Sequence, residues 1–265
     1  MLWLSFFSCH SQNFNTLKVK QRYSSEADYE KANPSQIKNR VSTTGKSIQI
    51  YNQGNLIQQI NKSSIPPNLN SLILSPQGDY FVAFEEAENA TDYLYFFRSD
   101  GVLLSKHLIN IYPNVKYSTN GEYVIVFNNY GKNILLFDKN GNLSFTGDYT
   151  DLIKDRSKIL YNVFFSENGN DLLINAGNDA HLVTTKDRVI KFKTSVGRVI
   201  DGDFRSDKEI VLKTASERIG LIDLKILSKS NGLILDTMDQ AKRIELTING
   251  VVVFKNSSIV EYEFK

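Results

Sequence analysis

Few residues of this chain have the types and spacing that enzyme chemistry needs, and the clearest are two aspartates. In the stretch DGDF, residues 201–204, Asp201 and Asp203 are two positions apart, so on a strand they share one face. Paired carboxylates can bind a cation or serve as a general acid and a general base. The alternative is a pair of polar side chains beside water, and we favour that interpretation.

The three histidines, His10, His107 and His181, predict no metal site. His107 and His181 fall on separate expected strands, with no carboxylate or cysteine at metal-ligand spacing. The stretch DKNGN at 138–142 resembles a calcium loop, but its glycine is at position 4 instead of 6, so we expect a hairpin turn. No nucleophile elbow, P-loop or dinucleotide fingerprint is present. We therefore expect no metal and no cofactor, and we favour a binding protein over an enzyme.

The composition restricts the class of protein and of partner. The chain has 265 residues, of which 41% are hydrophobic and 23% charged, which is typical of a globular protein with a sizeable core. The formal net charge is +2, and acidic residues alternate with basic ones. Because no basic stripe follows from this pattern, we expect no nucleic-acid partner.

The single cysteine, Cys9, follows an apolar run and Ser8 in MLWLSFFSCHSQ. This pattern resembles the end of a bacterial lipoprotein signal, in which the cysteine is lipidated. The stretch departs from that pattern because only eight residues precede Cys9 and none of them is Lys or Arg. We predict a truncated lipoprotein-type signal over 1–9, with an ordinary apolar N-terminus and a chance free cysteine as the alternative. An exported protein held at the membrane of the cell envelope by a lipid anchor only would follow, and a cytoplasmic protein is the alternative location.

Stretches of similar sequence recur along the rest of the chain and predict the elements that position these residues. Residues 10–40 are poor in large apolar groups and predict a polar tether, with a strand or two near Leu17–Val19. From residue 41, two kinds of hairpin alternate. The first kind appears as LSPQGDYFVAF, YSTNGEYVIVF, FSENGNDLLIN and a degenerate copy, FRSDKEIVLKT, with serines Ser75, Ser118, Ser166 and Ser206 at spacings of 43, 48 and 40 residues. Two hairpins per repeat give four strands, which is the period of a β-propeller blade.

These hairpins resemble the Ser-x-Asp/Asn-Gly-x-Tyr signature of WD40-like and TolB-like propellers. The resemblance covers residues 41–265 and implies an all-β fold, a single β-propeller of four-stranded antiparallel blades. The Trp-Asp dipeptide of WD40 repeats is absent, since the only tryptophan is Trp3. We predict six blades, with residues 10–40 contributing a strand; five blades is the alternative, if the two ends of the chain join in one sheet.

The loops between blades and those between second and third strands lie on one face of a propeller, where ligands usually bind around the axis. Tyrosine and arginine are frequent at binding hot spots, and acidic groups can fix a hydroxyl-rich ligand. The alternative is a solvated charged rim. The candidate residues on this face or near the axis are Glu85, Glu86, Tyr112, Tyr130, Asp179, Arg198, Asp201, Asp203 and Arg218.

The sequence therefore predicts a non-enzymatic binding or scaffolding propeller with a protein or glycan partner. Two alternatives remain: a propeller lyase or hydrolase that uses Asp201 and Asp203, and a cytosolic protein-interaction propeller.

Overall fold

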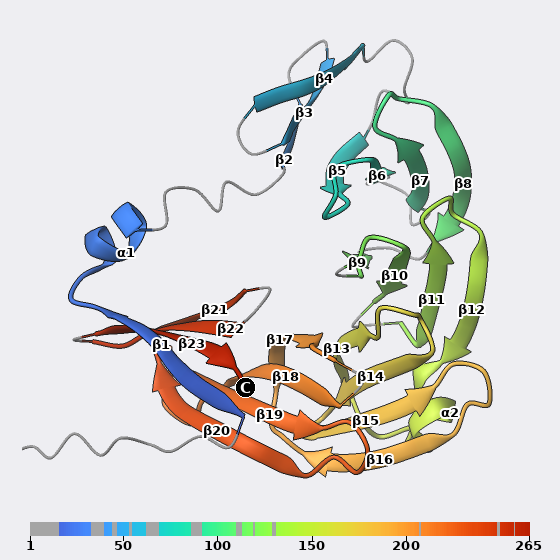
Figure 1. Ribbon diagram of the computed structural model, residues 1–265. Coiled ribbons are helices and arrows are strands. Elements are labelled where there is room, and N and C mark those ends of the chain that lie inside the picture. Colours follow the sequence, from blue (N-terminus) through green and yellow to red (C-terminus); the bar gives the residue numbers. More distant parts are fainter. Residues whose placement is uncertain are drawn as a thin grey trace, which may run out of the picture.

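The computed structural model describes most of the chain, and it is built almost entirely of antiparallel strands (Figure 1). The described residues are 16–32, 40–43, 47–52, 55–61, 69–85, 92–109, 113–118, 120–128, 131–206, 208–247, 250–256 and 258–265. Cys9 and His10, and with them the predicted signal, lie outside these residues.

The described strands form five four-stranded sheets and one three-stranded sheet. The three-stranded sheet consists of β2 (Arg40–Thr43), β3 (Ser47–Asn52) and β4 (Asn55–Asn61). The next two are β5 (Leu69–Leu74), β6 (Tyr80–Glu85), β7 (Asp92–Arg98) and β8 (Leu103–Ile109), then β9 (Asn114–Tyr117), β10 (Tyr123–Phe127), β11 (Asn133–Asp138) and β12 (Leu143–Asp148). They are followed by β13 (Leu160–Phe165), β14 (Asp171–Ala176), β15 (Asp179–Thr184) and β16 (Ile190–Ser195), then β17 (Val199–Phe204), β18 (Glu209–Ala215), β19 (Ile222–Ser228) and β20 (Ile234–Ala241). The last sheet joins β21 (Arg243–Thr247), β22 (Gly250–Phe254) and β23 (Ile259–Phe264) to β1 (Leu17–Tyr23).

The sheets are arranged as the blades of a propeller. Figure 1 shows them following one another around an open centre, with β9, β13 and β17 on the inside and β12, β16 and β20 on the outside. The inner strands β13 and β17 lie against each other. The fold class predicted from the sequence, an all-β propeller of six blades, is confirmed.

The last blade takes its outer strand from the other end of the chain. Strand β1 pairs antiparallel with β23, from Leu17 opposite Phe264 to Tyr23 opposite Ile259. Residues 17–23 were expected to lie in the tether, with a strand near Leu17–Val19, and they are part of the propeller. Helix α1 (Glu26–Ala32) follows, and its Tyr29 packs edge-on against Phe254 at 5.4 Å between ring centroids.

The β5–β6, β9–β10 and β13–β14 hairpins turn in the same way. The backbone amide of Ser75 donates to Tyr80, and that of Ser166 donates to Asp171, each at 2.9 Å. In the β17–β18 hairpin the equivalent hydrogen bond is donated by the Arg205 amide to the Glu209 carbonyl at 3.1 Å. Arg205 therefore occupies the position that serine has in the other hairpins. Aligning Ser206 with the other serines was therefore wrong, because this turn is one residue shorter.

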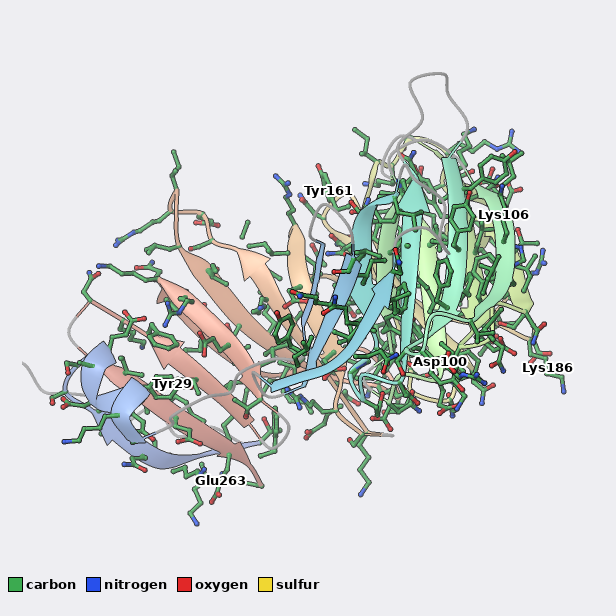
Figure 2. The ribbon with its side chains drawn as sticks, turned by 90° about the horizontal axis from the view of Figure 1, so that it is seen from above. Tyr29, Asp100, Lys106, Tyr161, Lys186 and Glu263 are labelled. Carbon is green, nitrogen blue, oxygen red and sulfur yellow. The ribbon has the colours of Figure 1, made fainter. Side chains whose placement is uncertain are left out.

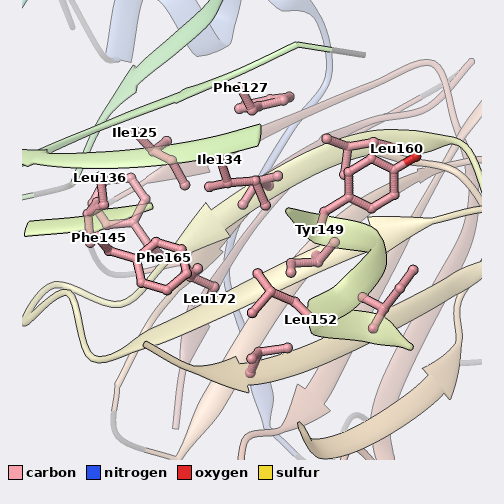
Figure 3. Close-up of a cluster of buried hydrophobic side chains, with 14 of the residues drawn as sticks. Ile125, Phe127, Ile134, Leu136, Phe145, Tyr149, Leu152, Leu160, Phe165 and Leu172 are labelled. Carbon is pink, nitrogen blue, oxygen red and sulfur yellow. The ribbon is translucent and has the colours of Figure 1, made fainter. Parts of the chain in front are cut away.

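The core fills the spaces between blades, because each sheet has two apolar faces to cover. One cluster joins the blade of β9–β12 to that of β13–β16 (Figure 3). A short helix, α2 (Tyr149–Ile153), lies in the connection between β12 and β13, and Asp148 caps it by accepting a 2.8 Å hydrogen bond from the Thr150 amide. Leu152 and Ile153 enter the cluster. Neither α1 nor α2, the helices of the described residues, has the length and apolar composition of a membrane span.

Candidate functional site

The inner strands of three blades carry an irregularity at the same place, one residue after their first. The register with the second strand shifts between Leu69 and Ser71, between Leu160 and Asn162, and between Val199 and Asp201. Each shift leaves one extra residue, which for β13 is Tyr161 and for β17 is Ile200. Bulges turn a side chain away from the direction that the pleat would give it, and they are common beside binding sites.

Arg198 lies beside two of these bulges at one end of the inner strands: it contacts Tyr161, and Ile200 is two residues along the chain, with its carbonyl bound to Asn162, the neighbour of Tyr161. The guanidinium carbon of Arg198 lies 5.4 Å from the centre of the Tyr161 ring, within the range of a cation–π interaction. Arg198 is exposed, Tyr161 is half-buried, and Ile200 has 46% of its surface exposed. Figure 2 shows Tyr161 at the end of the blades opposite to Asp100 and Lys186, which lie in hairpin turns. We call Tyr161, Arg198 and Ile200 the axial patch.

A buried asparagine holds the backbone of this patch in place. Asn175, whose surface is completely buried, donates to the carbonyls of Asp179 at 3.0 Å and Gly197 at 3.1 Å. Its side-chain oxygen accepts a 2.9 Å hydrogen bond from the Val199 amide. These bonds fix the backbone on both sides of Arg198, so its loop is pre-organised.

Polar side chains link four blades just inside the patch. The ammonium group of Lys116 on β9 donates to Asn162 on β13 at 2.5 Å, and Asn162 donates to the carbonyl of Ile200 on β17 at 2.9 Å. On β18, Lys213 pairs with Asp201 at 2.5 Å and donates to the carbonyl of Ile244 on β21 at 3.4 Å. We call Lys116, Asn162, Asp201 and Lys213 the axial network.

Lys116 has an unusual environment for an amine. Burial lowers its pKa to about 8; Asp201 opposes this effect and Lys213 adds to it. Its ammonium group also lies 4.3 Å from the centre of the Phe164 ring. Such an amine titrates close to neutral pH, unlike a solvated lysine.

For five of the candidate residues predicted from the sequence, the structure describes both the backbone and the side chain. Arg198 is in the axial patch and Asp201 in the axial network, while Asp203 lies farther along β17 with the Arg205 guanidinium 3.7 Å away. Asp179 begins β15 and pairs with Lys193 at 3.1 Å, and Arg218 is exposed between β18 and β19.

The other candidates are described in part or not at all. Glu85 ends β6, but its side chain is outside the described part of the structure. Glu86, Tyr112 and Tyr130 also lie outside the described residues.

The two strand aspartates do not form an acid–base pair of the expected kind. Asp201 lies against Lys213, and Asp203 is 3.7 Å from Arg205, so each carboxylate faces a different cation. Within the described ranges, no three residues among His, Cys, Asp and Glu gather where a metal ion could bind. The stretch 138–142 is a hairpin turn, in which Asp138 accepts from the amides of Asn140 and Asn142 at 2.9 and 2.8 Å.

Sequence reasoning missed Tyr161, Ile200, Lys116 and Lys213. Tyr161 and Ile200 are the extra residues of β-bulges, and the residue types at these positions do not predict a bulge. Lys116 and Lys213 look like ordinary alternating strand residues. The available signal for Tyr161 was its position just after a connection between two blades, on the face expected to bind.

Comparisons with known proteins support the fold. No protein-family model matches the chain, and no curated protein sequence matches it. Among solved structures, the chain is similar to a eukaryotic initiation factor, with a TM-score of 0.55, 12% identity and coverage of 85% of this chain and 62% of that one. It is also similar to the β-propeller domain of Myceliophteria thermophila Cps50 (Swd1), with a TM-score of 0.50, 11% identity and coverage of 86% and 80%. At these identities the likeness shows the propeller fold alone.

Proposed function

We propose that this protein is a non-enzymatic binding or scaffolding propeller, and that a partner protein docks on the axial patch. The observation that carries the proposal is the chemistry of the patch: an exposed arginine over a tyrosine ring, beside an exposed isoleucine. Arginine and aromatic residues dominate the energetics of protein interfaces. A propeller fold supports an interaction or scaffold role in general.

Rigidity of the patch supports the same proposal. Asn175 and the axial network tie the backbone of Arg198 and Ile200 to neighbouring blades. A partner that binds a pre-organised surface loses little free energy in ordering it. The large exposed apolar side chain of Ile200 favours a protein over a glycan, whose hydroxyl groups need polar partners.

We further propose that the protein works in the bacterial cell envelope with Cys9 as its lipid anchor. This part rests on the sequence around Cys9 alone. The test is the intact mass and membrane fractionation of the native protein and of Cys9→Ala, expressed with the upstream gene sequence. A diacylglyceryl mass on Cys9 and release of the variant from the membrane would support it, whereas unmodified protein in the cytosol would refute it.

The docking proposal is tested by photo-crosslinking in the native cell. A photoreactive phenylalanine analogue replaces Tyr161 in one variant and Lys186, on the opposite face, in a matched control. We expect a discrete adduct from position 161 only, and we expect Arg198→Ala to reduce it at an unchanged melting temperature.

The purified partner then gives the affinity. A hot-spot arginine contributes 2 kcal/mol or more, so Arg198→Ala should weaken binding about 30-fold. Equal adducts from both faces, or unchanged affinity of the variant, would contradict the proposal. A carbohydrate adduct would identify a glycan partner, and activity lost in Asp201→Asn but not in Arg198→Ala would identify an enzyme.

A further inference from the structure

The hairpins of the two outer strands share one feature in five blades, an aliphatic side chain just after the turn. In each of them the register between the two strands shifts at the same place, so one position of the outermost strand is equivalent in all five. The residues at this position are Leu56, Leu103, Leu143, Ile190 and Ile234. All but Ile190 are exposed, and beside Ile190 the preceding Val189 is exposed instead.

Exposed apolar side chains occur singly on most proteins, but in this chain they are concentrated at one kind of turn. The described residues include twelve large apolar side chains that are exposed, and seven of the twelve lie directly after these turns. The seven, which we call the apolar rim, are Leu56, Val102, Leu103, Leu143, Val189, Leu233 and Ile234.

The apolar rim lies at the end of the blades opposite to the axial patch. Asp100 and Lys186 belong to two of its turns, and Figure 2 shows both away from Tyr161. Because the outer strands are repeated around the propeller, the rim is spread over this end and forms no single groove. A peptide could contact only part of it, whereas a flat apolar partner such as a lipid bilayer can contact many of its members together.

The N-terminal part of the chain joins the propeller at the same end. In the β7–β8 turn the Arg98 amide donates to the Val102 carbonyl at 3.0 Å, and equivalent hydrogen bonds close the β11–β12, β15–β16 and β19–β20 turns. In the last blade the Lys265 amide donates to the Thr16 carbonyl at 2.9 Å. Thr16 therefore has the place of Val102, and the residues before it are attached where the other blades have this turn.

We propose that this end of the propeller lies on a lipid bilayer, with the apolar rim in the interfacial region. The choice of partner rests on the lipid anchor at Cys9 proposed above. Cys9 and Thr16 are seven positions apart, a length that an extended chain spans in at most about 25 Å. An anchor at Cys9 therefore keeps the rim at a high local concentration beside the membrane, so weak insertion of each side chain is enough.

The charges of the same turns do not favour an anionic lipid. Arg98 pairs with Asp100, and Lys139 pairs with Glu122 at 2.8 Å. Because basic groups stand beside acidic ones, we expect the rim to enter a zwitterionic bilayer without an anionic lipid. In this orientation the axial patch faces away from the membrane, where a partner protein can reach it.

Tryptophan fluorescence on vesicles tests the orientation. The single cysteine allows the full chain to be coupled through Cys9 to a maleimide lipid in phosphatidylcholine vesicles whose acyl chains are partly brominated, because bromine quenches tryptophan. Trp3→Phe first removes the native tryptophan. Leu103→Trp then places the probe in the rim, and Leu108→Trp is the matched control near the other end of the same strand, with 61% exposure against 49%. We expect the probe at position 103 to lose at least about half of its fluorescence, and the probe at position 108 to lose none.

A second set of variants shows whether the rim itself causes the contact. Leu143→Ser together with Leu233→Ser removes apolar area from the rim, so the quenching at position 103 should fall about threefold. Ile159→Ser together with Ile219→Ser, the same loss at exposed positions outside the rim, should leave the quenching unchanged.

Absence of quenching at position 103, or equal quenching at positions 103 and 108, would overturn the proposal. So would a dimer in solution that shields position 103 without vesicles, because the rim would then bind a second copy of the chain. The coupling supplies the anchor chemically, so this result is independent of lipidation in the cell. Quenching with unmodified Cys9 in the cell would support the bilayer contact and refute the anchor, whereas lipidated Cys9 without quenching would refute the bilayer contact alone.

Discussion

At the scale of single residues, the buried histidine His181 makes the stability of the protein sensitive to acid. The residue is 2% exposed, and neither ring nitrogen has a hydrogen-bond partner among the residues that the structure describes. Burial lowers its pKa below the ordinary value, with Lys193 adding to the effect and Asp179 opposing it. The folded protein therefore keeps His181 neutral at a pH where the unfolded chain binds a proton.

We predict that His181→Leu reduces the loss of stability on acidification. Below about pH 6.5 the unfolded state binds the additional proton, so the free energy of unfolding falls as pH decreases, by at most about 1.4 kcal/mol per pH unit. Urea unfolding at pH 7.5, 6.0 and 5.0 measures this effect. An identical pH dependence in wild type and variant would show that His181 is protonated without cost.

The buried amine of Lys116 gives a second pH dependence, in the alkaline range. Because its pKa of about 8 lies below the ordinary value of 10.5, the unfolded chain binds more protons between these two values. Keeping the folded-state amine charged below pH 8 costs on the order of 3 kcal/mol. This cost disappears as pH rises from about 8 to 10.5.

We predict that Lys116→Met raises the free energy of unfolding above that of wild type, and that this gain is larger at pH 7 than at pH 10. Met has a similar length and no charge, although it loses the hydrogen bond to Asn162. The comparison is made as the difference in unfolding free energy between the two proteins at each pH, which removes the other titrating groups. A constant difference from pH 7 to 10 would mean that the amine is well solvated.

At the scale of elements, a hairpin turn and a connection between blades depend on glycine to different degrees. Gly141 has a φ of 85° and Gly197 a φ of 84°, so any other residue is strained at both. A Cβ on Gly141 would also come within 2.7 Å of the buried Phe96 ring and would collide with Ser105, whereas nothing lies within 4 Å of a Cβ on Gly197.

We predict that Gly197→Ala costs about 1 kcal/mol, from backbone strain alone. Gly141→Ala should cost more, about 2–4 kcal/mol, because the two blades that meet at Phe96 and the β11–β12 turn must separate. Thermal or urea unfolding of both variants measures the difference. Equal costs would show that Phe96 and Ser105 can move aside freely.

Most strands and hairpins could be predicted from the sequence, whereas most residues of the axial patch and the axial network could not. Alternating apolar residues around Asn-Gly and Asp-Gly pairs predicted the hairpins because turn chemistry is local. The bulges at Tyr161 and Ile200 depend on how inner strands meet around an axis, which no local pattern encodes. The place of Arg205 was missed because its turn is one residue shorter than its equivalents.

At the scale of the whole molecule, β1 completes the last blade. Leu17, 2% exposed, lies in the core between the last two blades, together with Val260 and Tyr262. Val19, two residues along the same strand, is 40% exposed. The ion pairs of β1, Lys20 with Glu261 at 2.6 Å and Lys18 with Glu263 at 3.4 Å, are on the surface and contribute little.

We predict that Leu17→Ala lowers the free energy of unfolding by about 2–5 kcal/mol. Val19→Ala, the matched change at an exposed position, should lower it by about 0.5 kcal/mol or less. Chemical unfolding followed by circular dichroism compares them. A small cost at Leu17 would mean that β1 is held by backbone pairing alone.

The strand that completes the last blade shows how far sequence reasoning reaches at this scale. Six blades, with a strand from residues 10–40, were predicted, and the structure assigns that strand to residues 17–23 at the outer edge of the last sheet. Their polar composition favours a tether, since β1 is an outer strand with most of its side chains in solvent. Its partner, β23, is far away in the sequence, so no local pattern could reveal the pairing.

The pairing of β1 with β23 also constrains the order in which the chain can fold during synthesis. Lys20 and Glu261 are 241 positions apart, so β1 cannot pair until the blades between them in the sequence have been synthesised. Until β23 emerges, the apolar face that Leu17 covers stays open to other chains. The risk of aggregation through that face therefore persists during synthesis until β23 is available to pair with β1.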